Sequence, residues 1–138
     1  MPFIVQRRVE FCDTDMAGIV HFSNFFRFME FAEVAFLREK GLNVRFEYEG
    51  QQLAFPRVSA TCDYSVPAKF EEVLDIAVRV VSIGTKSVTY SHNFSRAGTT
   101  IANGKITTVC CTMTDDHKLK SIEIPVTLRQ LLSENLTE

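Results

Sequence analysis

The sequence predicts an α+β domain in which a curved antiparallel β-sheet wraps around a long central α-helix. Two observations lead to this fold class. Residues 24–40 contain no Gly or Pro and are mostly apolar, as expected for a buried helix. After residue 56 the hydrophobic period changes from near 3.6 to 2, which indicates strands. Because no helices repeat between these strands, a doubly wound fold is excluded.

The N-terminal part of the chain predicts one strand and then the helix. Residues 3–11 form the opening strand, and the helix begins after the capping residue Ser23. Only Arg27, Glu30 and Glu33 interrupt the apolar surface of its first three turns. A helix that is apolar on nearly all sides is expected to be enveloped by the rest of the fold.

The rest of the chain predicts four strands joined as an antiparallel meander. These strands are expected at residues 58–65, 73–83, 88–95 and 100–114. Turn-forming residues separate them at 67–69, 84–86 and 96–99. Asn103 and Gly104 lie inside the last run and predict a β-bulge there. A short terminal helix is expected over residues 125–132.

Composition and charge limit the possible partners. The 138 residues carry 15 Lys+Arg against 17 Asp+Glu, a formal net charge of −2. We therefore expect a single domain over residues 1–138 and no nucleic-acid partner. The chain has no secretion signal and no membrane-length apolar run, and its cysteines form no CxxC pair. These features predict a cytoplasmic protein with reduced thiols, no membrane partner and no metal site.

The segment between the opening strand and the helix carries the candidate chemistry. Asp15 lies in a loop beneath which Ile19, Val20 and the helix must pack, so its carboxylate is expected at the rim of the core. The first N–H groups of the helix, around residues 22–25, lack partners within the helix and carry its positive dipole end. They can polarise a carbonyl while the carboxylate attacks it or activates water. A thioester suits this site because a thiolate leaves readily.

This segment resembles the motif of the 4-hydroxybenzoyl-CoA thioesterase family of hotdog-fold proteins. The motif reads D-x-D-x-x-G-x-V, then two variable positions, a small residue, Asn and an aromatic residue. The matching residues are Asp13, Asp15, Gly18, Val20, Ser23, Asn24 and Phe25. The resemblance implies a hotdog fold and an acyl-CoA thioesterase that needs no cofactor. It further implies that Asp15 is the nucleophile or general base and that the backbone N–H of Phe22 polarises the thioester carbonyl.

One departure from the family bears on the substrate. Several family members have His at the position of Phe22, whereas His21 here lies one residue earlier. An aromatic residue at this position resembles the branch that acts on aromatic acyl groups and uses the main chain. An aryl-CoA substrate is therefore favoured, and short- or medium-chain acyl-CoA and carrier-protein thioesters are retained as alternatives.

Two charged residues are candidate substrate contacts. Glu30 lies on the expected buried helix, two turns below its start, where the family often has an acid. It either contacts a polar acyl end or pairs with a cation such as Arg27. Lys86 follows a turn where the family often has basic residues that meet the phosphates of CoA, and it is otherwise a solvated lysine.

Three residues near the helix start are weighed in the same way. Ser23 and Asn24 are interpreted first as helix caps, and otherwise as substrate contacts. His21 is interpreted first as a packed or surface histidine, and otherwise as a substrate contact.

Other functions are also considered for this segment. Asp13 and Asp15 begin like a calcium loop, but Ala17 and Asn24 stand where further ligands are needed. A sugar-nucleotide DxD site would need a parallel nucleotide-binding half. A hydratase of the same fold would need a His paired with a carboxylate, which the sequence does not indicate. The main alternative is a hotdog protein that binds acyl-CoA or acyl carrier protein without hydrolysing it.

A curved sheet with an exposed edge predicts pairing with a second copy of the chain. The resemblance implies the same, because hotdog thioesterases are dimers, commonly paired again into tetramers, with the substrate tunnel between subunits. We therefore expect a homodimer or homotetramer in which Lys86 serves the neighbour's Asp15.

Overall fold

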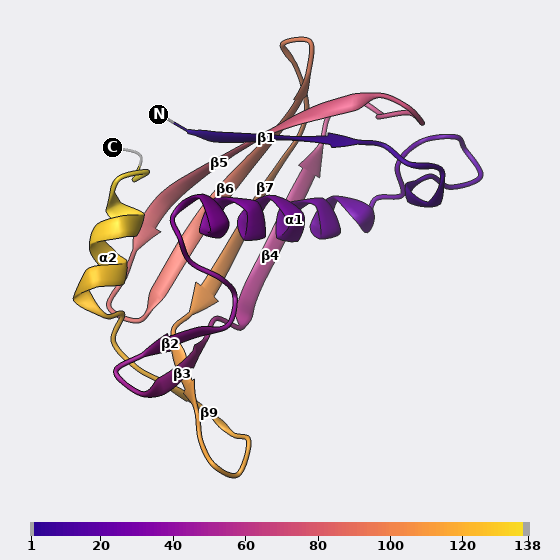
Figure 1. The fold of residues 1–138 in the computed structure, drawn as a ribbon. Coiled ribbons are helices and arrows are strands. Elements are labelled where there is room, and N and C mark those ends of the chain that lie inside the picture. The colour runs from indigo at the N-terminus through magenta and orange to yellow at the C-terminus, as the bar shows by residue number, and fades with distance from the viewer. Residues whose placement is uncertain (1, 137–138) are drawn as a thin grey trace.

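A long helix crosses one face of a five-stranded antiparallel sheet (Figure 1). The structure is a computed structural model that describes residues 2–136. The sheet has the strand order β1-β5-β6-β7-β4, with β1 at Phe3–Arg8, β4 at Arg57–Tyr64, β5 at Val73–Ile83, β6 at Ser87–Arg96 and β7 at Thr99–Val109. Helix α1 spans Asn24–Glu39 and lies across these strands. The predicted α+β class and the long helix are confirmed.

The sheet buries one face of α1. Phe28 and Phe36 are 1% and 0% exposed and anchor the helix in the core. Burying a large apolar side chain of this kind stabilises the fold by about 2 kcal/mol. Phe31, on another face, is 40% exposed. Within a single copy of the chain the helix is not enveloped as expected, because the sheet covers α1 on one side only.

Gly104 leaves room on the sheet for the Met29 side chain of α1. A Cβ atom at this residue would lie 2.3 Å from Met29 Sδ. Asn103 and Gly104 pair in regular register with both β4 and β6, so the predicted bulge at this pair is wrong. The glycine serves helix packing instead. Register shifts occur elsewhere, between Arg57 and Ser59 and at two places along β6.

The predicted meander is correct for three strands and wrong for the fourth. Strands β5, β6 and β7 are joined by the two expected hairpins. Strand β4 pairs with β7 at the far edge, and β1 takes the place beside β5. The segment after Tyr64 stays beside β7, because the N–H groups of Ser65 and Val66 both donate to the carbonyl of Ile101.

A second, small sheet was not predicted. Its four strands are β2 at Phe46–Tyr48, β3 at Gln51–Ala54, β8 at Cys111–Met113 and β9 at Leu119–Ser121, in that order. Glu49 and Gly50 form the turn between β2 and β3, and both have positive φ. Gly50 is therefore the sequence signal for this hairpin, because glycine favours such turns. The long final strand predicted at 100–114 is interrupted at Cys110, which lets β8 join this sheet.

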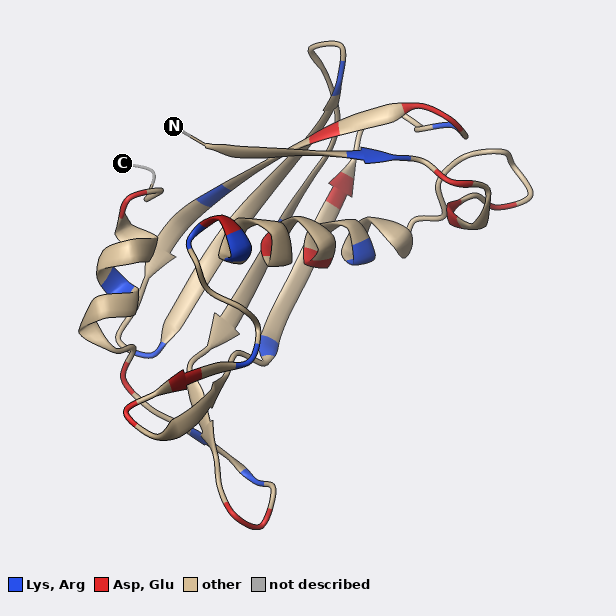
Figure 2. Cartoon of the chain, viewed as in Figure 1, with Lys and Arg blue, Asp and Glu red and all other residues tan. Residues whose placement is uncertain are grey.

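The chain closes with the short helix that was predicted. Helix α2 spans Val126–Ser133, and its Leu128 and Leu132 are buried at the edge of the core. No helix in residues 2–136 is long and apolar enough to span a membrane. Basic and acidic residues alternate around the ribbon rather than separating by sign (Figure 2).

A buried ion pair joins α1 to the edge strand β4. Glu33 is 1% exposed, and its Oε2 lies 2.5 Å from Arg57 Nη2. Burial raises the pKa of Glu33, while the charge of Arg57 opposes that rise. His92 lies under the same helix with 0% exposure, and burial together with the charge of Arg57 lowers its pKa to about 4.

Candidate active site

An open pocket of about 420 Å³ lies at the N-terminal end of α1. It is bounded by the segment that precedes and begins α1 and by the segment that follows β4. Its lining residues are Asp15, Ile19, Val20, Phe22, Phe25, Tyr64, Ser65, Val66, Pro67 and Ala68. The Val20 N–H donates to the carbonyl of Ala68 at 2.8 Å, which fastens the two walls together. The candidate catalytic residues Asp15 and Phe22 therefore meet in one pocket.

A tight turn holds Asp15 at the pocket wall. The Asp15 N–H donates to the carbonyl of Ile19 at 2.9 Å, and the Gly18 N–H donates to the carbonyl of Asp15 at 3.0 Å. Gly18 has φ of 81°, a conformation that other residues adopt at a cost. Asp15 Oδ1 accepts the N–H of Ala17 at 2.8 Å, as in an Asx turn. One carboxylate oxygen thus orders the loop, and the residue stays half-buried rather than sealed.

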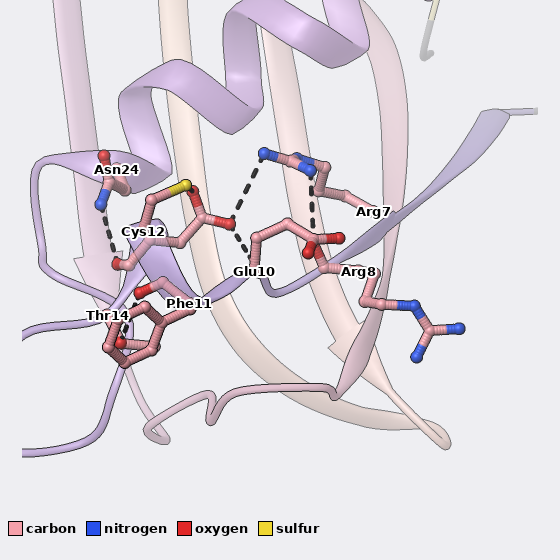
Figure 3. Close-up of polar contacts among 8 residues, drawn as sticks. Arg7, Arg8, Glu10, Phe11, Cys12, Thr14 and Asn24 are labelled. Atoms are coloured by element: carbon pink, nitrogen blue, oxygen red, sulfur yellow. Dashed lines mark hydrogen bonds and ion pairs between the residues drawn. The ribbon is translucent and has the colours of Figure 1, made fainter.

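Asp13, the first acid of the motif, fixes the base of this loop through contacts with Arg7, Glu10 and Asn24, the three of which are labelled in Figure 3. Its buried carboxylate accepts the N–H of Glu10 at 2.8 Å and lies 3.5 Å from the guanidinium of Arg7. Its carbonyl accepts the N–H of His21 at 3.0 Å and the side-chain amide of Asn24 at 2.8 Å. Because Asp13 binds both the loop and the helix start, it sets the position of Asp15 relative to α1.

The start of α1 is built from main-chain contacts rather than side-chain caps. The Asn24 N–H donates to the carbonyl of His21 at 2.9 Å. Ser23 occupies the N-cap position but makes no side-chain cap, and the Asn24 side chain is used by Asp13. The interpretation of Ser23 and Asn24 as side-chain caps is therefore wrong. Within residues 2–136, the Phe22 N–H donates to no protein acceptor.

His21 is held in a local contact beside the pocket. Its Nδ1 lies 2.7 Å from Ser23 Oγ and accepts the Ser23 N–H at 3.3 Å. Accepting a backbone N–H places the ring proton on Nε2. The ring also packs on Phe22 with 4.6 Å between ring centroids. His21 and Ser23 thus lie next to the pocket, although neither is part of its lining.

Glu30 and Lys86 do not join Asp15 within one chain. Glu30 is exposed on α1, contrary to the buried environment expected for it, and it is Glu33 that is buried and paired. Lys86 precedes β6, whereas the Asp15 pocket lies near the opposite end of that strand. The 10 residues of β6 extend about 30 Å. In a single chain Lys86 is therefore too far away to contact a thioester at Asp15.

The sequence did not point to the wall formed by residues 64–68. Tyr64 is the last residue of β4, and its hydroxyl donates to the carbonyl of Phe22 at 2.9 Å. Its ring packs edge-on against Phe25, with 5.3 Å between centroids. The sequence marks Pro67 only as a strand break. No local pattern marks these residues, because their role depends on β4 lying beside β7 and under α1.

The described residues hold no cluster suited to a metal. Across residues 2–136, no group of three His, Cys, Asp or Glu side chains is placed to bind one.

A carboxylate and a helix N-terminus beside an aromatic pocket are elements that acyl transfer uses. The chain also matches the family model of the thioesterase-like superfamily over residues 9–132. It is 35% identical over 125 residues to a protein of Aquifex aeolicus, covering 88% of this chain and 92% of that protein. The chain therefore belongs to the thioesterase-like superfamily, and its fold is the hotdog fold that the motif implied.

Two further comparisons fit this family. The chain is 29% identical to 4-hydroxybenzoyl-CoA thioesterase of a Pseudomonas species, covering 94% of this chain and 96% of that enzyme. A 1,4-dihydroxy-2-naphthoyl-CoA thioesterase of Synechocystis matches the fold with a TM-score of 0.85 at 21% identity, covering 97% of each chain. At that identity the structural match speaks for the fold alone.

Proposed function

We propose that this chain hydrolyses an aryl- or short- to medium-chain acyl-CoA thioester to the free acid and CoA. The observation that carries the proposal is that Asp15 and Phe22 line one pocket, while the Phe22 N–H donates to no protein acceptor within residues 2–136. Thioester hydrolysis by the similar Pseudomonas enzyme supports the same reaction class. The acid and the N–H donor supply the two elements that acyl transfer to water needs.

In the proposed mechanism the thioester carbonyl oxygen accepts the Phe22 N–H. Negative charge that develops on this oxygen is stabilised by the N–H and by the positive end of α1. Asp15 then either attacks the carbonyl carbon or removes a proton from an attacking water. In the first route the C–S bond breaks to give a mixed anhydride and thiolate, and water hydrolyses the anhydride. In the second route water adds directly, and the same bond breaks to give acid and thiolate.

The pocket walls favour an aromatic acyl group. Phe22, Phe25 and Tyr64 present three aromatic rings to the space beside Asp15. Aromatic rings attract one another in edge-to-face or offset geometry beyond the effect of buried area. A flexible alkyl chain would fill the same space with a greater loss of conformational entropy. We therefore rank aryl-CoA above alkyl-CoA substrates.

We also propose that the active unit is a homodimer or homotetramer. Strand β4 forms one edge of the sheet, and all its residues except Cys62 are exposed, although the other strands of the sheet are half covered. An edge that is open on both faces is stabilised by pairing with another strand. A partner seated here would come close to Tyr64 and hence to the pocket. It would also bring a second Lys86 and Glu30 within reach of this site.

The remaining site residues have supporting roles in the proposal. His21 and Ser23 lie beside Phe22 and are candidates to contact a polar part of the substrate. Asn24 orders the loop through Asp13. Lys86 and Glu30 are candidate contacts from the neighbouring subunit. The cytoplasmic location stays a prediction.

Thiol release from a panel of thioesters tests the proposed reaction. The panel contains benzoyl-, 4-hydroxybenzoyl-, phenylacetyl-, butyryl- and octanoyl-CoA, and benzoyl and octanoyl groups on acyl carrier protein. We expect hydrolysis with higher kcat/KM for the aryl-CoA thioesters. Binding of these thioesters with no release of thiol would instead establish the non-catalytic alternative. A preference for octanoyl over every aryl group would contradict the ranking drawn from the pocket.

Two matched edge variants test the oligomer. Val58 on β4 is 61% exposed, and Ile4 on the opposite edge strand β1 is 57% exposed. Sedimentation equilibrium should find an oligomer for the wild type and for Ile4→Lys, and dissociation together with loss of activity for Val58→Lys. A stable, fully active monomeric wild type would refute this part of the proposal.

A further inference from the structure

The end of strand β4 is linked directly to the main chain that carries the carbonyl-polarising N–H. Tyr64 Oη donates to the carbonyl of Phe22 at 2.9 Å. No other side chain from β4 is recorded in a hydrogen bond with residues 21–25 of the described chain. The contact joins two segments that are 42 residues apart in the sequence.

The bond from Tyr64 restrains the peptide unit next to the one that polarises the substrate. The Phe22 N–H shares a peptide unit with the carbonyl of His21, which accepts the Asn24 N–H at 2.9 Å. The following unit contains the carbonyl that Tyr64 binds. Together the two bonds fix the main chain on both sides of the Phe22 Cα atom, and so they restrict rotation of the N–H away from the pocket.

The ring of Tyr64 is itself held in place. It stands at the last paired position of β4, opposite Ala102 on β7. Its edge-on contact with Phe25, at 5.3 Å between centroids, fixes it against the first turn of α1. A tyrosine side chain has only two torsions between its backbone and its ring, so the hydroxyl can move little relative to β4. The position of β4 therefore restrains the position of the Phe22 carbonyl.

We propose that Tyr64 is a positioning residue that aims the Phe22 N–H at the thioester carbonyl through its hydrogen bond to the Phe22 carbonyl. This inference rests on the proposed function and adds a residue to it. A positioning role differs from a substrate contact in one measurable respect: losing the hydroxyl lowers kcat and leaves KM nearly unchanged, because the ring that lines the pocket is retained.

The first test compares Tyr64→Phe with the wild type in benzoyl-CoA hydrolysis. The matched control is Tyr48→Phe, which removes a hydroxyl from the half-buried tyrosine of β2, outside the pocket. We expect kcat to fall about 10-fold in Tyr64→Phe, with KM within about twofold. Tyr48→Phe should match the wild type. An unchanged kcat in Tyr64→Phe, or a change in KM alone, would overturn the positioning role.

The second test measures carbonyl polarisation without turnover. Infrared difference spectra of benzoyl-CoA with a ¹³C-labelled carbonyl would be recorded on Asp15→Asn and on Asp15→Asn/Tyr64→Phe. We expect the carbonyl band to shift to lower frequency on binding to the first protein and to shift less on binding to the second. Equal shifts would overturn the inference, even if the double variant were less stable. Failure of the wild type to hydrolyse any thioester would instead refute the proposed function.

Discussion

Removing Arg57 should expose the cost of the buried carboxylate on α1. Glu33 is 1% exposed, and in Arg57→Leu it loses its partner at 2.5 Å, while its Oε1 already lacks a hydrogen bond in the described structure. A charge stranded in this way is expected to cost about 3–5 kcal/mol. The leucine keeps the apolar stem in place, so the loss reports the charge more than the packing.

Protonation of Glu33 limits this loss and makes it depend on pH. For a glutamate with an unfolded pKa of about 4.3, the free-energy cost of protonating the carboxylate is about 4 kcal/mol at pH 7 and about 1 kcal/mol at pH 5. The folded pKa in Arg57→Leu is raised further, since the opposing charge of Arg57 is gone. A raised folded pKa gives stability that is present at low pH and is lost as pH rises. The variant should therefore be destabilised most at pH 7 and regain stability toward pH 5.

Urea unfolding at pH 7 and pH 5 measures both effects. Arg38→Leu, an exposed change on the same helix, is the control and should change the free energy of unfolding by less than about 0.5 kcal/mol. The double variant Glu33→Leu/Arg57→Leu should recover most of the loss, because no charge is left unpaired. A loss below about 1 kcal/mol at pH 7 in Arg57→Leu, or a loss independent of pH, would refute the reasoning.

Two further predictions concern the same interface between α1 and the sheet. His92 has a folded pKa of about 4 against about 6.5 unfolded, so the wild type should lose about 3 kcal/mol of stability as pH falls from 7 to 4. His92→Leu should lack this component in urea unfolding, whereas the exposed His117→Asn should keep it; equal pH dependence in both variants would contradict the assignment. Gly104→Ala should destabilise the protein by about 1–3 kcal/mol, because its Cβ meets Met29 Sδ at 2.3 Å. Thermal unfolding of Gly104→Ala/Met29→Ala should then find less than the sum of the two single losses, and strict additivity would contradict the clash.

Local sequence patterns predicted most helices and strands. The order of the strands in the sheet depends on long-range pairing, which these patterns do not contain. The helix at residues 24–40 and the hairpins around 84–86 and 96–99 follow from apolar period and turn residues, and all three are present. The position of β4 beside β7 has no local signal, since a short connection and a crossing one both begin with the same turn residues. Gly104 similarly suggested a bulge, while its actual role depends on Met29, far away in the sequence.

The candidate site divides in the same way. Asp15 and the helix start were found from the motif because they are adjacent in the sequence, and they do meet in one pocket. Tyr64 was missed because its contact with Phe22 exists only once β4 lies against the start of α1. Glu30 was expected to be buried, and the helix presents Glu33 to the sheet in its place. Glu30 and Glu33 are three residues apart on the same helix. Because apolar residues surround this helix on almost all sides, the sequence does not indicate which of the two acids faces the sheet.

The most direct test of the proposed chemistry is the rate of thiol release by Asp15→Asn with saturating benzoyl-CoA. Asparagine keeps the size of the side chain and can still accept the Ala17 N–H, but it cannot attack a thioester or take a proton from water. Asp115→Asn, an exposed change in the turn between β8 and β9 and outside the Asp15 pocket, is the control. We expect kcat to fall about 10³-fold in Asp15→Asn while benzoyl-CoA still binds, and to be unchanged in Asp115→Asn. Full hydrolysis by Asp15→Asn would contradict the account.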